Sequence, residues 1–279
     1  MTTWQFTACI ACAGAVTGFV GSLTGLGGGF IVVPVLTLIF GVDIRYAIGA
    51  SLICIIATST GSAARYVRDG YSNIRIGMFL EIATSLGAVT GAWMAPRVSA
   101  TFIGGLFGAV LWYAAYRTSA RSRESKAAGA PDRLAEYFGM EGKCPAPGGV
   151  IMYRPRNVIL GFGVMSLAGI FSGLLGAGSG MIKVVALDQV MGLPFKVAAT
   201  TSSFMIGVTA AAAACVNLSR GYIDPVLAMP VTLGVLAGAL LGSRVLPAAP
   251  PRRLRLLFAM LLAAVGAQMI YSSFAGRIQ

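Results

Sequence analysis

The chain has 279 residues, of which 57% are hydrophobic and only 11% are charged, and its formal net charge is +12. A soluble domain carries about 25% charged residues, so this composition excludes a soluble enzyme, a nucleic-acid-binding domain and a disordered chain. It indicates a protein that is largely covered by lipid. The absence of histidine removes histidine-based acid–base catalysis and histidine metal sites. The positive charge is typical of the cytoplasmic loops of a membrane protein, and we expect no nucleic-acid partner.

Eight apolar segments follow one another along the chain, and a bilayer-spanning helix needs about 20 such residues. They cover residues 4–40, 46–67, 74–95, 99–117, 157–191, 197–219, 225–246 and 254–275. The segments 4–40 and 157–191 are too long for one straight crossing, and a glycine cluster interrupts each of them. Because glycine is expected where a helix breaks, the sequence predicts an all-α, polytopic membrane protein of 8–10 helices with two broken helices.

The two halves of the chain repeat each other. A shift of 151 residues aligns Gly25, Gly27 and Gly29 with Gly176, Gly178 and Gly180, Ser51 with Ser202, Thr58 with Thr209, and Gly70-Tyr71 with Gly221-Tyr222. A duplicated membrane chain with broken segments at corresponding places is typical of secondary transporters. We therefore divide the chain into a first transmembrane repeat (1–117), a charged cytoplasmic loop (118–156) and a second transmembrane repeat (157–279).

The orientation of the two halves depends on how the broken segments cross the membrane. The tract from Arg117 to Arg156 holds eight basic and four acidic residues, and we expect it in the cytoplasm. If each broken segment crosses once, the halves are parallel. If each forms a hairpin pair, the halves are inverted, and only Arg45, Arg97, Arg220 and Arg277 remain outside. We favour the inverted arrangement because it also explains the excess length of the two segments.

The two glycine clusters form the first candidate binding site. A helix that begins after a break points its unpaired N–H groups and its positive dipole end toward the gap, which suits an anion. The glycines could instead permit close packing of helices. The expected substrate-binding residues are Gly25, Gly27, Gly28 and Gly29 in the first cluster and Gly176, Gly178, Ser179 and Gly180 in the second.

Nearby side chains extend this candidate site. Lys183 lies three residues after Gly180, and an intramembrane charge is a functional hypothesis by default, here as a group that neutralises the anion. The alternative is that its ammonium reaches the membrane interface. The hydroxyls of Ser51, Thr201 and Ser202 can donate to an oxyanion, or else bond across helices or to their own backbone.

Acidic residues inside the apolar segments are the candidates for ion coupling. Glu81 and Asp188 lie well within such segments, where a carboxylate can carry a proton through a transport cycle. Asp188 could instead form a structural ion pair with Lys183. The pair Cys9-x-x-Cys12 is a weak redox motif, which we interpret as packing. With no metal-ligand cluster and no nucleophile–base pair, we expect no enzyme activity, no cofactor and no metal.

The glycine-rich stretch from Gly18 to Leu36 resembles the opening of the TauE/SafE sulfite exporter family. A weaker echo runs from Ser172 to Lys183 and is followed by Ala198-Ala-Thr-Thr-Ser-Ser203. The likeness covers most of the chain except the loop at 118–156. Residues carry over only at the two glycine motifs and the helix starts that follow them.

The resemblance implies a multi-pass transporter in a bacterial inner membrane that moves small anions, especially sulfite and organosulfonates such as sulfoacetate. Export is the usual role. Together with the repeat, it predicts a secondary transporter working by alternating access, with a small anionic substrate, the lipid bilayer and protons as candidate partners. Two alternatives remain open, a passive channel for small anions and an importer of thiosulfate- or sulfate-like anions. A membrane-embedded structural or redox partner is a further alternative.

Overall fold

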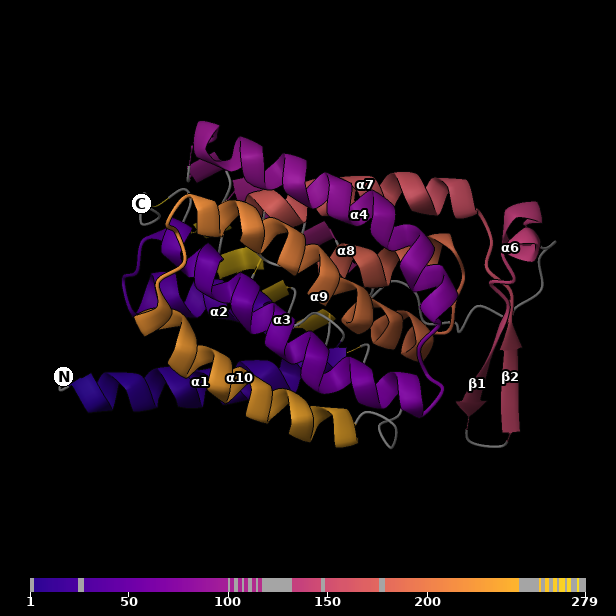
Figure 1. Ribbon diagram of the computed structural model, residues 1–279, viewed down its shortest axis with the longest axis horizontal. Coiled ribbons are helices and arrows are strands. Elements are labelled where there is room, and N and C mark those ends of the chain that lie inside the picture. Colours follow the sequence, from indigo (N-terminus) through magenta and orange to yellow (C-terminus); the bar gives the residue numbers. More distant parts are fainter. Residues whose placement is uncertain are drawn as a thin grey trace.

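A computed structural model describes residues 3–24, 28–99, 132–146, 149–175 and 179–245, with separate residues between 101 and 116 and between 256 and 275. The first half contains α1 (Thr3–Thr24), α2 (Gly29–Pro34), the π-helix η1 (Val35–Ile39), α3 (Ile44–Arg68), α4 (Ile74–Met94) and the 3-10 turn η2 (Ala95–Arg97). The central loop contains α6 (Arg133–Tyr137) and the strands β1 (Gly142–Ala146) and β2 (Gly149–Tyr153). The second half contains α7 (Val158–Leu175), α8 (Gly180–Val185), the π-helix η3 (Ala186–Val190), α9 (Phe195–Ser219) and α10 (Pro225–Val245) (Figure 1).

The helices confirm the predicted all-α polytopic architecture. Within the described residues, four helices are long and apolar enough to cross a membrane, namely Ile44–Arg68, Ile74–Arg97, Phe195–Ser219 and Pro225–Val245. Shorter apolar helices cover Thr7–Leu23 and Val158–Leu174. The expected spans at 99–117 and 254–275 lie largely outside the described residues.

The two halves contain the same elements at the spacing of the sequence repeat. Helices α2, η1, α3 and α4 each have a counterpart 151 residues later, in α8, η3, α9 and α10, with the same bounds after the shift. A glycine with positive φ follows each of the two π-helices, Gly41 (65°) after η1 and Gly192 (74°) after η3. Glycine adopts this conformation without a steric penalty, so the chain can turn there into the long helix that follows.

Both long apolar segments are divided into two helices at the predicted places. Helix α1 ends at Thr24 and α2 begins at Gly29, whereas α7 ends at Leu175 and α8 begins at Gly180. Residues 25–27 and 176–178, which include four of the predicted site glycines, lie outside the described residues. The residue before α8, Ser179, has φ +46°, which is a left-handed backbone conformation uncommon outside glycine.

Glycines bring the outer helices into backbone contact. On α10, a methyl group added to Gly234 or Gly238 would meet the carbonyl oxygen of Ala11 or Ala15 on α1. These contacts advance together along both helices, so α1 and α10 run side by side in the same direction. Small residues allow such close approach between membrane helices, where packing replaces the hydrophobic driving force.

The same arrangement recurs between α4 and α7. A methyl group at Gly169 would meet the carbonyl oxygen of Thr84, and one at Gly173 would meet that of Ala88. In Figure 1 the N-terminus lies at the left end of α1, whereas α7 begins at the right, beside the β1–β2 hairpin. Helices α1 and α7 therefore start at opposite ends of the helical body.

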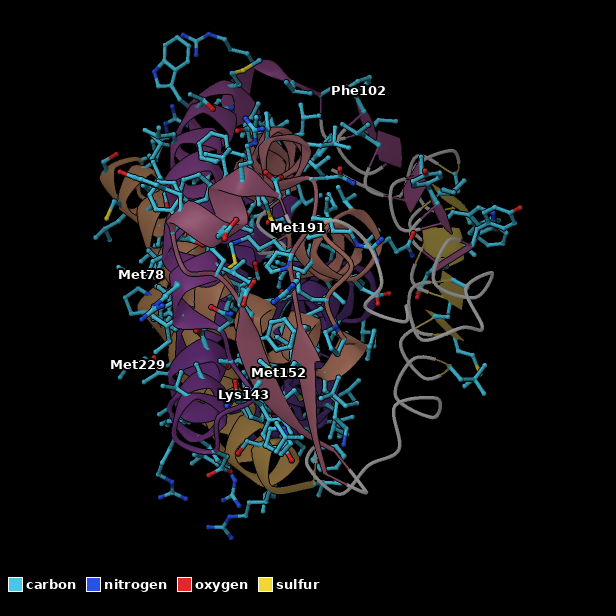
Figure 2. The ribbon with its side chains drawn as sticks, turned by 90° about the vertical axis from the view of Figure 1, so that its right-hand side faces the viewer. Met78, Phe102, Lys143, Met152, Met191 and Met229 are labelled. Carbon is cyan, nitrogen blue, oxygen red and sulfur yellow. The ribbon has the colours of Figure 1, made fainter. Side chains whose placement is uncertain are left out.

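The central loop folds against the turn between α3 and α4. Strands β1 and β2 pair in antiparallel register, and the Asn73 amide Nδ2 donates to the Met140 carbonyl at 2.9 Å and to the Tyr153 hydroxyl at 3.1 Å. The Asp132 carboxylate accepts from the Val158 N–H at 2.8 Å and so joins α6 to the start of α7. Figure 2 looks onto this end, with Lys143 and Met152 on the hairpin. The sequence predicted a charged loop here and no strands.

We expect Gly238→Ala to weaken the helical body and Gly163→Ala to leave it intact. A methyl group at position 238 meets the backbone of α1, whereas one at position 163 on α7 finds no atom within 4 Å. Overpacking costs about 1–3 kcal/mol. Heating in detergent, followed by size-exclusion chromatography, measures the folded fraction, and equal losses for the two variants would contradict the packing role.

Candidate functional site

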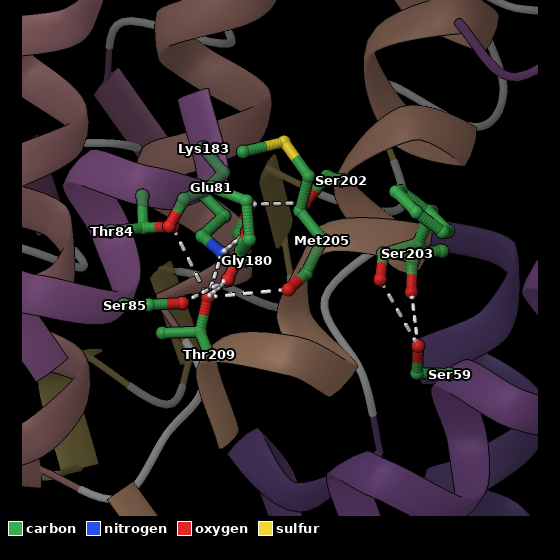
Figure 3. A network of polar contacts seen from close by, with 11 residues as sticks. Ser59, Glu81, Thr84, Ser85, Gly180, Lys183, Ser202, Ser203, Met205 and Thr209 are labelled. Carbon is green, nitrogen blue, oxygen red and sulfur yellow. Dashed lines mark hydrogen bonds and ion pairs between the residues drawn. The ribbon is translucent and has the colours of Figure 1, made fainter. Parts of the chain in front are cut away.

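A buried ion pair joins α4 and α8 in the middle of the helical body. The Lys183 Nζ atom lies 3.2 Å from the Glu81 Oε2 atom. The Lys183 residue is 0% exposed and Glu81 is 6% exposed. Lys183 therefore does not reach the surface, and within the described residues its charge is balanced by an acid on another helix (Figure 3).

Hydroxyl groups complete the surroundings of this pair. Thr209 on α9 accepts a hydrogen bond from the Lys183 ammonium and donates one to Glu81 Oε1. The Ser85 hydroxyl donates to the same carboxylate oxygen at 3.0 Å, and Thr84 Oγ1 lies 3.3 Å from Thr209 Oγ1. A buried ion pair is tolerated only when further hydrogen bonds satisfy its atoms, and Thr209 and Ser85 provide them.

The break before α8 explains why a lysine can sit at this depth. Helix α8 begins beside the first half of α9, where the Ser202 hydroxyl donates to the Gly180 carbonyl at 3.1 Å. Lys183 is the fourth of the six residues of α8, and its side chain bonds to Glu81 on α4 and Thr209 on α9. Ser202 and Gly180, which were both expected at the binding site, are thus in contact, and the serine hydroxyl bonds to the glycine backbone.

The first half has the same frame without the charges. In the 151-residue register, Val32 takes the place of Lys183, Thr58 that of Thr209 and Thr232 that of Glu81. The Thr58 hydroxyl donates to the Cys54 carbonyl at 2.8 Å and accepts from the Gly28 N–H at 3.2 Å. The matched threonines therefore have different partners, and the buried charges make the site asymmetric.

The remaining predicted hydroxyl residues have different surroundings. Ser51 donates to the Ile48 carbonyl of its own helix at 2.8 Å, and its backbone packs against Gly29, where no side chain would fit. Thr201 accepts from the Asn73 N–H at 3.0 Å, so its hydroxyl is bonded at the turn between α3 and α4. Asp188, the second predicted acid, is 6% exposed on η3.

Two serines beside the second break have unused hydroxyls. Ser172 on α7 is 1% exposed and Ser179 is 3% exposed. Within the described residues, neither hydroxyl has a hydrogen-bond partner. Such groups are costly to bury, so they are available to a polar ligand at the break. Ser179 was predicted from the sequence as a site residue, whereas Ser172 and the ion-pair partners Ser85 and Thr209 were not. The repeat had already aligned Thr58 with Thr209.

Comparison with known proteins shows that the sequence matches a known family. Residues 10–269 match the family described as "Sulfite exporter TauE/SafE". The chain is 24% identical over 265 residues to the probable membrane transporter protein YunE of Bacillus subtilis, covering 92% of this chain and 95% of that protein. It is 26% identical over 231 residues to the probable membrane transporter protein YdhB of the same organism, covering 83% and 85%.

A third relative comes from another organism. The probable membrane transporter protein MJ0441 of Methanocaldococcus jannaschii is 23% identical over 272 residues, with 92% of each chain covered. No solved structure matches the chain. The family and these relatives indicate a multi-pass membrane transporter with a small-molecule substrate, and not an enzyme. Because the match extends over nearly the whole sequence, the chain belongs to the sulfite exporter TauE/SafE family.

Proposed function

We propose that this protein is a secondary transporter that exports a small sulfur oxyanion or organosulfonate, such as sulfite or sulfoacetate, across a bacterial inner membrane. The observation that carries the proposal is the buried Lys183–Glu81 pair beside the second helix break. Buried charge at membrane depth is expensive and marks substrate and ion pathways. The family description supplies the sulfur chemistry.

We further propose that the two halves are inverted repeats. The opposite directions of α1 and its repeat counterpart α7, which start at opposite ends of the helical body, support this (Figure 1). Where α3 crosses α9, the Ser59 hydroxyl donates to the Ser203 carbonyl at 2.7 Å. A rocking motion of one group of helices against the other, about a site between them, gives alternating access.

The anion binds at the two breaks in this proposal. Backbone N–H groups from both glycine clusters, the ammonium of Lys183 and the free hydroxyls of Ser172 and Ser179 are the donors. Glycine permits close approach of the ligand to the backbone. The asymmetric charge favours binding of the anion near the second break, beside Lys183.

The ion pair also provides a means of coupling. An anion that takes the Lys183 ammonium leaves the Glu81 carboxylate without its cation, and an uncompensated buried charge costs about 3–5 kcal/mol. A proton on Glu81 removes that cost. The anion and a proton therefore cross together, in the direction that their combined gradients favour, and the Lys183–Glu81 pair re-forms when both have left.

Purified protein in proteoliposomes should transport sulfite and sulfoacetate and discriminate against sulfate. Thiosulfate completes the panel, and each anion is compared with protein-free vesicles because neutral forms of sulfite cross lipid unaided. Sulfoacetate is the decisive substrate, since it is charged throughout the neutral range. Saturable sulfoacetate or sulfite flux supports the proposal, and flux of neither anion above that of empty vesicles contradicts it.

The ion pair should be essential for transport beyond its structural role. Lys183→Met alone leaves Glu81 uncompensated and should lower both folding and flux. The double variant Lys183→Met with Glu81→Gln removes both charges, which is often neutral for stability. We expect it to elute as a folded species and to lose flux by at least about tenfold. Wild-type flux in this folded double variant would contradict a role of the ion pair in transport and leave it only a structural role.

Proton coupling should depend on Glu81. A pH gradient, acidic on the side from which sulfoacetate enters, should accelerate wild-type flux. It should leave any remaining flux of Glu81→Gln unchanged, because the glutamine amide does not titrate. Asp188→Asn is the matched control, because it also neutralises a buried acid, and it should keep the response. A full response in Glu81→Gln would contradict the assignment.

A further inference from the structure

A hollow opens at the end of the helical body away from the hairpin. It lies between the start of α3, the last turns of α9 and the end of α4, and it encloses about 430 Å³, including space open to the outside. Its polar lining residues are Arg45, Asn217, Arg220 and Tyr222, and the rest of the described lining is apolar. It is separate from the Lys183–Glu81 pair, whose residues do not line it.

The hollow is positively charged and its arginines are held in place. Arg220 donates from Nη1 to the Ala92 carbonyl at 2.6 Å and from Nη2 to the Trp93 carbonyl at 3.2 Å. The Arg45 guanidinium lies 5.9 Å from the centre of the Tyr222 ring. Among the described residues neither arginine forms an ion pair, because the four ion pairs found there involve other side chains.

The nearby acids do not neutralise the hollow from within. No acidic side chain is among its described lining residues. The Asp43 carboxylate accepts from the Arg45 backbone N–H at 2.8 Å, and the Asp224 carboxylate accepts from the Val226 N–H at 2.9 Å. Both acids therefore cap the starts of helices, and among the described residues neither carboxylate forms an ion pair with Arg45 or Arg220.

Arginines are unexpected at this place. With the basic central loop in the cytoplasm, the proposed topology puts the hollow outside, where lysine and arginine are under-represented. That topology leaves Arg45, Arg97 and Arg220 as the outside basic residues within the described part of the chain. Two of the three line the hollow, whereas Arg97 stacks on the Trp93 ring at 4.0 Å.

The internal repeat indicates that the hollow is not a by-product of the fold. In the 151-residue register, Asn217 corresponds to Tyr66 and Arg220 to Asp69. Tyr66 is fully buried, with its hydroxyl 2.9 Å from the Ser22 hydroxyl. Asp69 lies 3.5 Å from the Arg65 guanidinium. At the corresponding place, a large buried side chain stands where Asn217 lies, and an acid paired with arginine stands where Arg220 lies.

The hairpin covers what remains of that corresponding place. Lys196, the counterpart of Arg45, is 8% exposed and lies 6.0 Å from the Tyr71 ring centre. Cys144 on β1 is close enough to Lys196 and Tyr71 to interact with both, and burial raises the pKa of its thiol. One end of the molecule is thus covered while the other presents two arginines.

We propose that this hollow is a second binding site for the transported class of anion, a small sulfonate or sulfur oxyanion held by Arg45 and Arg220 at the outer mouth of the transport path. The inference rests on the proposed function and topology. A basic cleft with low-dielectric walls raises the local concentration of an anion and its association rate, by about tenfold or more. The site receives the anion as it leaves the interior and admits it again when flux is reversed.

The first test measures occupancy directly. Purified full-length protein is treated with phenylglyoxal, which modifies arginines, and the labelling rate at each arginine is followed by mass spectrometry with and without sulfoacetate. We expect sulfoacetate to slow labelling of Arg45 at least threefold while Arg97 is unaffected. Equal labelling of Arg45 with and without sulfoacetate, or equal protection of Arg97, would overturn the proposal. This readout needs no transport, so it stands apart from the failure of the proposed function.

The second test measures the consequence for flux. Arg45→Gln should raise the half-saturating sulfoacetate concentration about tenfold with an unchanged maximal rate, and Arg45→Lys should restore it. Arg97→Gln is the matched control, because it removes the same charge at the same end and does not line the hollow. In 1 M salt the screening length is only about 3 Å, so the difference in half-saturating concentration between Arg45→Gln and wild type should become smaller. Equal effects of Arg45→Gln and Arg97→Gln would overturn the proposal.

Discussion

Hydrocarbon offers no hydrogen-bond partners, so every backbone group freed where a helix breaks must be satisfied by the protein itself. Beside each break, a hydrogen bond joins the described end of a short helix to the long helix that follows it. The Gly28 N–H donates to the Thr58 hydroxyl, and the Gly180 carbonyl accepts from the Ser202 hydroxyl. These contacts hold the described ends of α2 and α8 against α3 and α9, and Lys183 follows three residues after Gly180.

The two halves share a frame and differ in charge. Lys183 and Glu81 carry opposite charges in a place where the other half has Val32 and Thr232. A symmetric frame suits a motion that exchanges the roles of two halves, whereas an asymmetric site gives the ligand one preferred cation. The ends of the molecule differ in the same way, since the hairpin covers one end and arginines line a hollow at the other.

Much of the frame could be predicted because it depends on local patterns. The repeat of Gly25–Gly29 at Gly176–Gly180 gave the register that all the paired helices keep, and the excess length of two apolar segments gave the positions of the breaks. The ends of the helices could be predicted from the glycines and from the start of the next apolar segment. Strands β1 and β2 were missed because each has only five residues, in a tract whose charge suggested an unstructured loop.

The pairings inside the site could not be predicted from local patterns. Glu81 and Lys183 are 102 residues apart, and their contact requires knowing that α9 packs against both α4 and α8. Helices that are apolar on most sides give no pattern that identifies the inward face. Hydroxyls are ambiguous for another reason, since Ser51 is satisfied within its own helix while Thr209 bonds across to the ion pair. Sequence alone could name the charged residues and could not choose their partners.

The central claim is that one buried anion site is exposed alternately to the two sides of the membrane. Counterflow in proteoliposomes tests it most directly, by comparing entry of labelled sulfoacetate into vesicles with and without unlabelled sulfoacetate inside. A carrier returns faster with a ligand bound, so the account predicts accelerated entry and transient accumulation in the preloaded vesicles. Entry that is unaffected or slowed by internal sulfoacetate, with a rate linear in concentration, would identify a passive channel and contradict the account.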